Sequence, residues 1–174
     1  MLVNLNKKTV FAHIPKTGGA SISEVLLKRG FVRYGDPHVN RLKDFPYFLK
    51  VCMVRNPYEI VASYYIHKFE SGATYNFEFF VDNLFKMRSG PKVISQHKYS
   101  LDCNIVMRYE RYDADFKSFC NFLNIKYEKP GKIHKFKEYT WRDFYYPKVA
   151  GMVYEIAHTD FKVLEYDSNS WKGG

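Results

Sequence analysis

A run of seven residues near the N-terminus has the side chains and the spacing to bind a phosphate-like anion. An apolar stretch leads into the run, which reads Pro15, Lys16, Thr17, Gly18, Gly19, Ala20 and Ser21. Glycines let a backbone approach a ligand closely, and the first N–H groups of a following helix have no partner inside that helix. Lys16 adds a positive charge, and the hydroxyl groups of Thr17 and Ser21 add donors. Residues 15–21 therefore predict an anion cradle.

A second segment carries an arginine and a serine at a spacing that suits a second anionic group. Arg55 follows an apolar run, Asn56 and Pro57 come next, and Ser63 lies two helical turns later. Arginine can hold a phosphate with two parallel hydrogen bonds, and a serine hydroxyl can add another. A ligand with one anionic group in each segment is a nucleotide that is phosphorylated at two positions.

The hydrophobic pattern indicates which elements position these two segments. Apolar runs predict strands over 10–13, 31–34, 48–54 and 104–108, and amphipathic stretches predict helices over 20–29, 57–68, 76–87, 113–123 and 147–158. Strands that alternate with helices predict an α/β fold. We expect a three-layer, P-loop-like sandwich, with a central parallel sheet flanked by helices, in a single domain over residues 1–174. Ligands bind at the carboxyl ends of parallel strands, so Lys16 and Arg55 are expected to converge.

Together the two segments resemble the sulfotransferase superfamily that uses 3′-phosphoadenosine 5′-phosphosulfate (PAPS), and in particular its carbohydrate, heparan-sulfate 2-O-type branch. The resemblance implies that the loop holds the 5′-phosphosulfate through Pro15, Lys16, Thr17, Gly18, Gly19, Ala20 and Ser21. It also implies that Arg55 and Ser63 bind the 3′-phosphate, and that Lys135 belongs to a loop that closes over the nucleotide. PAPS is then the sulfate donor, 3′-phosphoadenosine 5′-phosphate (PAP) is the product, and no metal is required.

Weaker motifs extend the resemblance over most of the chain, in the segments Gln96–Leu101, Ile105–Glu110 and Tyr146–Tyr166. Two positions depart from the family pattern. The family usually has threonine where this chain has Ala20, and it often has arginine where this chain has Ile60. The first change removes a hydroxyl group and the second removes a charge, whereas the lysine and the clamping arginine are both kept.

The resemblance implies sulfuryl transfer to a hydroxyl acceptor, most simply on a saccharide, and this reaction needs a base for the acceptor proton. His38 lies between the two phosphate segments and matches in position the catalytic histidine of uronyl 2-O-type members. Glu24 is the alternative base, because other branches use a glutamate. Lys16 is expected to stabilise charge on the leaving phosphate oxygen. His13, just before the loop, is expected to be structural.

Two other function classes stay open at this point. The phosphate cradle is shared with P-loop-type kinases, but here Lys16 precedes the glycines rather than following them. A non-catalytic polyanion or nucleic-acid binder is the third class, because the chain has 27 Lys and Arg against 18 Asp and Glu, a net charge of +9. The charge is concentrated in residues 1–70, with 11 basic against 5 acidic residues, and this concentration near the phosphate motifs makes a nucleic-acid partner the weaker interpretation.

Composition limits the class of protein and the compartment that we expect. A hydrophobic content of 46% excludes a disordered chain, and Cys52, Cys103 and Cys120 form neither a disulfide framework nor a metal-ligand pattern. No apolar run approaches the ~20 residues that span a bilayer, and residues 1–8 lack the apolar core of a signal peptide. We therefore expect a soluble, cytoplasmic protein in a bacterial or viral setting, with no membrane partner. The chain is short for the family, so completion of the acceptor site by a partner or an oligomer is left open.

Overall fold

The computed structural model describes residues 1–36, 40–72, 74–86, 95–131 and 140–173. The chain divides into two compact units. The first contains Met1–Arg55 and Lys98–Lys135, and the second contains Asn56–His97 and Phe136–Gly174. The single domain expected over residues 1–174 stays a prediction.

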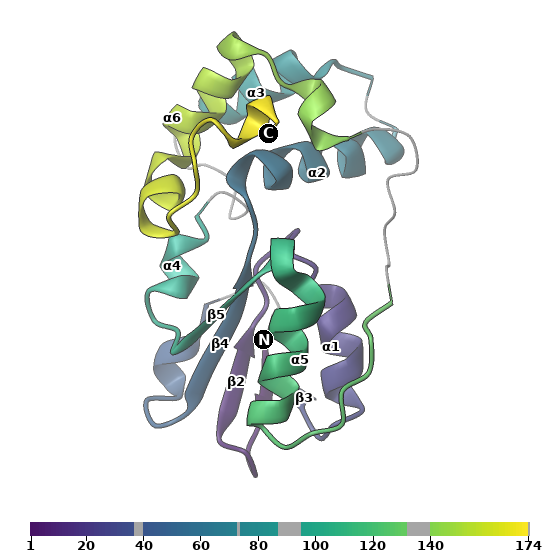
Figure 1. Ribbon diagram of the computed structural model, residues 1–174, viewed down its shortest axis with the longest axis vertical. Coiled ribbons are helices and arrows are strands. Elements are labelled where there is room, and N and C mark those ends of the chain that lie inside the picture. Colours follow the sequence, from purple (N-terminus) through teal and green to yellow (C-terminus); the bar gives the residue numbers. More distant parts are fainter. Residues whose placement is uncertain (37–39, 73, 87–94, 132–139, 174) are drawn as a thin grey trace. The chain divides into compact units, whose positions relative to one another are not determined.

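The first unit is built on a five-stranded sheet with the order β3-β1-β2-β4-β5 (Figure 1). Its strands are β1 (Leu2–Asn4), β2 (Thr9–Ala12), β3 (Val32–Arg33), β4 (Leu49–Val54) and β5 (Ile105–Arg108). β2, β4 and β5 run parallel to one another, with Ala12 opposite Cys52 and Val54 opposite Arg108. β1 is antiparallel to both β2 and β3.

The α/β fold is confirmed, but the sheet is mixed rather than wholly parallel. The reason lies in the connection between β1 and β2, which is only residues 5–8 and contains Lys8 with a φ of 44°. A turn of this length can join only antiparallel neighbours, whereas parallel strands need a crossover of a dozen or more residues. The expected parallel arrangement therefore holds for the three strands that are separated by such crossovers.

Two helices of the first unit pack on the same face of this sheet. They are α1 (Gly19–Leu27) and α5 (Tyr112–Phe122), and Figure 1 shows both beside the strands. Ile22 and Leu26 of α1 share one buried cluster with Phe116 and Phe119 of α5 and with the strand residues Phe11, Val51, Met53 and Met107. Burial of this apolar surface fixes α1, and hence the loop that precedes it, against the strand ends.

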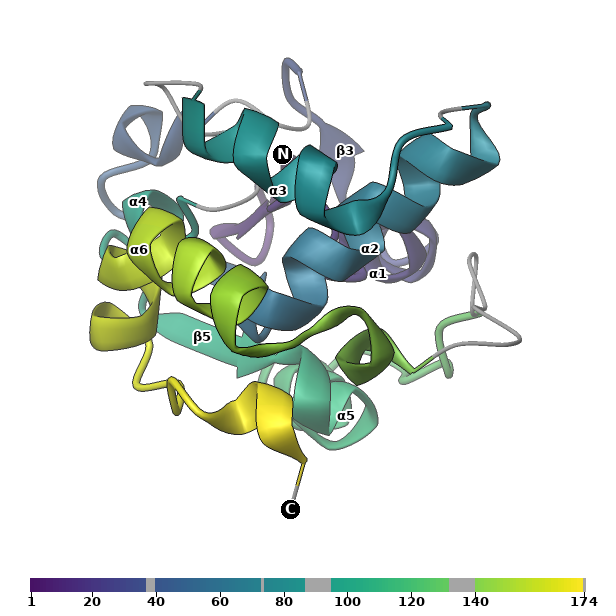
Figure 2. The same cartoon turned by 90° about the horizontal axis from the view of Figure 1, so that it is seen from above.

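The second unit is helical. Its main helices are α2 (Pro57–Glu70), α3 (Phe77–Lys86) and α6 (Pro147–Val163), which pack on one another around a ring-rich core (Figure 2). Asn56 caps α2 as expected, since its side chain accepts a hydrogen bond of 3.0 Å from the backbone N–H of Tyr58, and Pro57 occupies the first turn. All three helices lie within a few residues of the expected ranges.

Short elements complete the described chain. They are α4 (His97–Ser100) and the 3₁₀ turns η1 (Leu42–Asp44), η3 (Tyr109–Arg111), η4 (Trp141–Phe144) and η5 (Ser170–Lys172). In the part of the chain that the structure describes, no helix has the length and apolar character needed to cross a lipid bilayer.

Candidate functional site

Three neighbouring strand ends of the first unit deliver the residues of the candidate site. The loop of residues 13–18 follows β2, Arg55 follows β4, and Tyr109 follows β5. Because these strands are parallel, their carboxyl ends meet at one edge of the sheet. The Arg55 guanidinium donates a hydrogen bond of 3.0 Å from Nη1 to the carbonyl oxygen of Lys16. Lys16 and Arg55 are thus brought together, as the sequence predicts.

The loop has an unusual backbone conformation. Lys16 has a φ of 64° and Gly18 a φ of 79°, and both lie in the left-handed region. This conformation suits glycine, but it costs a residue with a Cβ atom roughly 1–2 kcal/mol. Gly18 is the N-cap of α1, which begins at Gly19. The turn therefore ends with the first N–H groups of a nine-residue helix, where a helix carries partial positive charge.

Thr17 and Ser21, whose hydroxyl groups the sequence offers as ligand donors, are both buried close to other groups of the protein. Thr17 is fully buried, and its hydroxyl lies 2.9 Å from the carbonyl oxygen of Ile14. A carbonyl can only accept, so the Thr17 hydroxyl must donate its proton within the loop. Ser21 is also buried, and its hydroxyl lies near that of Tyr112. Thr17 therefore stabilises the turn, and donors for a ligand come mainly from the backbone and Lys16.

The glycines of the loop make room for aromatic rings of the protein itself. A Cβ atom on Gly18 would lie 2.7 Å from the ring of Tyr112 and 3.1 Å from that of Tyr109, and a Cβ atom on Gly19 would lie 2.4 Å from the ring of His13. The sequence suggests that these glycines allow a ligand to approach. The structure adds a different reason, because a side chain at either position would collide with a neighbouring ring.

Arg55 is held on two sides within the first unit. Its side chain is 7% exposed, one nitrogen donates to Lys16, and its guanidinium carbon lies 3.9 Å from the centre of the Tyr109 ring. A buried guanidinium stacked on an aromatic face is strongly oriented. Arg55 thus contacts the loop directly, in addition to the 3′-phosphate role that the resemblance implies.

The other residues expected to bind the nucleotide are placed differently. Ser63 is buried in α2 and belongs to the second unit, so its pairing with Arg55 around one phosphate stays a prediction. Ile60, where the family often has arginine, is fully buried in the core cluster of the second unit. An arginine at this position would place a charge in an apolar core. His38 and Lys135 lie outside the described residues.

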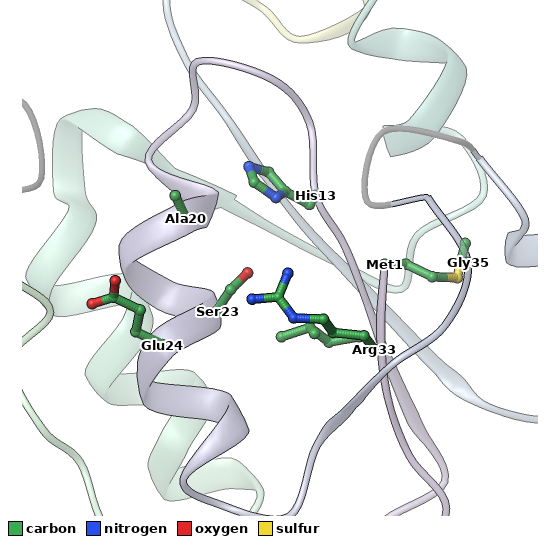
Figure 3. Close-up of a pocket in the computed structure, with 8 residues that line it drawn as sticks. Met1, His13, Ala20, Ser23, Glu24, Arg33 and Gly35 are labelled. Carbon is green, nitrogen blue, oxygen red and sulfur yellow. The ribbon is translucent and has the colours of Figure 1, made fainter.

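A cavity of about 180 Å³ lies beside α1 in the first unit. Its lining includes His13, Ala20, Ser23, Glu24 and Arg33. Figure 3 shows the side chains of His13, Ser23 and Arg33 converging, and the carboxylate of Glu24 turned away from them. Ala20 belongs both to the anion loop and to this lining. One residue is thus shared by the loop and the cavity lining, and an imidazole and a guanidinium face the cavity.

Sequence reasoning missed Tyr109 and Tyr112 as parts of this site. Tyr112 donates a hydrogen bond of 2.9 Å to the carbonyl oxygen of Gly18, and burial raises the pKa of its hydroxyl. A signal was present, because Tyr109 directly follows the third parallel strand, at the edge where Lys16 and Arg55 were expected. Among the described residues, no group of three or more His, Cys, Asp or Glu side chains could hold a metal ion.

Comparisons of the chain with protein-family models, with curated proteins and with solved structures each found no match.

Proposed function

We propose that the chain is a sulfotransferase that moves a sulfuryl group from PAPS to a hydroxyl group of a carbohydrate. The observation that carries this proposal is the convergence of Lys16 and Arg55 at neighbouring ends of parallel strands, where Arg55 donates to the Lys16 carbonyl over 3.0 Å. Two cationic side chains and a helix N-terminus at one edge favour a highly charged anion. The three-layer, P-loop-like sandwich is the finer fold that goes with this proposal.

The donors at the loop suit the 5′ end of PAPS. The N–H groups at the start of α1, at Gly19 and Ala20, have no acceptor within the helix, and Lys16 adds a full charge. Arg55 adds a planar guanidinium, and we propose that it binds the 3′-phosphate together with Ser63. When bound, PAPS supplies an activated sulfuryl group on a phosphate leaving group.

Different residues of the chain then stabilise the leaving group and remove the acceptor proton. Lys16 stabilises the negative charge that develops on the leaving phosphate oxygen. The acceptor oxygen forms a bond to sulfur, the bond from sulfur to the phosphate oxygen breaks, and a base takes the acceptor proton. His38 and Glu24 are the proposed bases, although the Glu24 carboxylate is turned away from the side chains that converge at the cavity beside α1. His13 is a third group for this role, because its side chain faces that cavity. The cavity beside α1 is the proposed place of the acceptor.

Ligand preference tests the proposed function against its two alternatives. Thermal unfolding is followed with PAP, with ATP and Mg²⁺, and with a short oligonucleotide. We expect PAP to raise the Tm most, and we expect Lys16→Ala to remove most of this gain. Lys117→Ala, a change of an exposed lysine on α5, serves as the matched loss of one positive charge. A larger gain with ATP, or none with PAP, would contradict the proposal.

Turnover separates the candidate bases from the binding residues. His38→Ala, Glu24→Gln and His13→Gln are compared for PAP affinity and for sulfuryl transfer from PAPS to a panel of saccharides. The variant that lacks the base keeps the affinity for PAP while kcat falls ~100-fold or more. If all three variants keep wild-type turnover, the base lies elsewhere in the chain.

A further inference from the structure

Two carbonyl groups of the anion loop are held by side chains from the end of β4 and from the start of α5. The Lys16 carbonyl accepts from the Arg55 guanidinium at 3.0 Å, and the Gly18 carbonyl accepts from the Tyr112 hydroxyl at 2.9 Å. The Gly18 carbonyl also accepts from the backbone N–H of Ile22 at 3.5 Å. The carbonyl groups of Lys16 and Gly18 are thus both held by hydrogen bonds from side chains outside the loop.

Holding these carbonyl groups also fixes the direction of two N–H groups. In a planar trans peptide the C=O and the following N–H point in opposite directions, and the described chain has no cis peptide bonds. The Lys16 carbonyl therefore sets the direction of the Thr17 N–H, and the Gly18 carbonyl sets that of the Gly19 N–H. Both N–H groups therefore point away from the Arg55 and Tyr112 side chains that hold the carbonyl groups.

Aromatic packing connects the two side chains, Arg55 and Tyr112, that hold the loop carbonyl groups. The Arg55 guanidinium carbon lies 3.9 Å from the centre of the Tyr109 ring, and the Tyr109 and Tyr112 rings meet edge to face with centres 5.5 Å apart. Both rings press on the Cα of Gly18, where a Cβ atom would lie within 3.2 Å of them. Arg55, Tyr109, Tyr112 and Gly18 form one packed group, which we call the loop lock.

The backbone of the loop needs such support. Lys16 is held at a φ of 64°, a region that residues other than glycine rarely adopt. Conformations of this kind persist where the surroundings determine them, and they recur at ligand-binding sites. The loop lock supplies surroundings of that kind from residues distant in the sequence.

We propose that Tyr109 and Tyr112 are positioning residues, which together with Arg55 hold the loop so that the Thr17 and Gly19 N–H groups are aimed at the anion before it binds. The identity of that anion as the 5′ end of PAPS rests on the proposed function. The lock itself does not, because it is a property of the loop without ligand. Preorganised donors bind more tightly than donors that must be ordered on binding.

The test compares Tyr112→Phe, which removes the hydroxyl and keeps the ring, with Tyr65→Phe. Tyr65 also donates to a backbone carbonyl, that of Tyr75 at 3.0 Å, but it lies in the second unit. Amide hydrogen exchange of Ile22, whose N–H is bonded to the Gly18 carbonyl that Tyr112 also holds, is measured without nucleotide. We expect exchange there to be about fivefold faster or more in Tyr112→Phe than in Tyr65→Phe. Equal exchange in the two variants would overturn the lock, whatever the ligand is.

Nucleotide affinity supplies the second readout. The lock acts on the loop, so Tyr112→Phe should weaken PAP and its 3′-dephospho analogue by the same factor, about fivefold to tenfold. Tyr109→Leu, which removes the ring face under Arg55, should also weaken both nucleotides, but it should weaken PAP more, because Arg55 is the proposed 3′-phosphate ligand. A loss confined to the 3′-phosphorylated nucleotide would overturn the proposal. If the wild-type protein does not bind PAP, the proposed function fails, and the exchange measurement still decides the lock.

Discussion

Gly18→Ala should destabilise the first unit by more than the backbone conformation alone can explain. Gly18 has a φ of 79°, so an alanine there loses roughly 1–2 kcal/mol from its left-handed conformation. The new Cβ would also lie 2.7 Å from the Tyr112 ring. That ring cannot swing away without breaking the hydrogen bond from its hydroxyl to the Gly18 carbonyl. Overpacking of this kind costs about 1–3 kcal/mol, so the expected total is about 2–5 kcal/mol.

Gly30→Ala is the matched control for this change. Gly30 has nearly the same φ, 81°, and lies in the same unit, but the nearest atom to its Cβ position is 3.5 Å away, an ordinary contact. It should therefore show only the backbone cost, about 1–2 kcal/mol. The free energy of unfolding is measured by urea titration for both variants. An equal loss in the two would mean that the rings do not press on Gly18, and the loop lock would be refuted.

A double-mutant cycle tests whether a side chain at position 18 would contact the Tyr112 ring directly. Truncating the ring with Tyr112→Ala makes room for the new methyl group, so the two changes should couple. We expect the cost of Gly18→Ala in the Tyr112→Ala background to fall toward that of Gly30→Ala. Additive losses would contradict direct contact between the two residues.

Three further predictions follow from the structure. Ala20→Thr adds a hydroxyl on the exposed first turn of α1, so calorimetry should show PAP binding about threefold to tenfold tighter, and unchanged binding would place the 5′ end elsewhere. Asp160→Asn should lower the free energy of unfolding, measured by urea titration, by about 1–3 kcal/mol. The two oxygens of the buried Asp160 carboxylate accept hydrogen bonds from the N–H groups of Gln96 and His97, each at 2.9 Å, whereas an amide has only one oxygen that can accept. Burial raises the pKa of Tyr58 to about 12, whereas an unfolded tyrosine ionises near 10. The stability that this group contributes is therefore complete below pH 10 and is lost as pH rises, so the Tm should fall between pH 10 and pH 12. A Tm that stays constant over this range would contradict the burial of the Tyr58 hydroxyl.

The elements with local signals could be predicted from the sequence. Helix α2 is the clearest case, because Asn56 as cap and Pro57 in the first turn mark its start without any knowledge of the rest of the chain. The apolar run of β4 is similar, since strands buried in a parallel sheet are continuous in hydrophobicity. β5 also has an apolar run, but it is the edge strand, and of its four residues only Met107 is buried. The ends of β2 and β4 were enough to predict that Lys16 and Arg55 lie at one edge of the sheet.

Other features have no clear pattern in the residues that form them. β1 is three residues long and too short for a periodic pattern, and its place next to β2 depends on the pairing of Leu2 with Phe11. The mixed direction of the sheet follows from that pairing. The reason for Gly18 is also tertiary, because nothing in the run around it shows that Tyr112, far along the chain, fills the space of a side chain. The sequence therefore predicted the loop and its charge but not what holds it.

Backbone amide chemical shifts recorded during a titration with PAP test whether the loop of residues 15–21 binds the nucleotide. We propose that the 5′ end of the nucleotide lies on the loop and the first turn of α1. The largest shift changes are therefore expected at residues 16–21, saturating together, and they should be much smaller with ATP and Mg²⁺. Lys16→Ala should weaken the response without moving it to another part of the chain. Changes centred away from residues 16–21, or equal changes with ATP and Mg²⁺, would contradict the account.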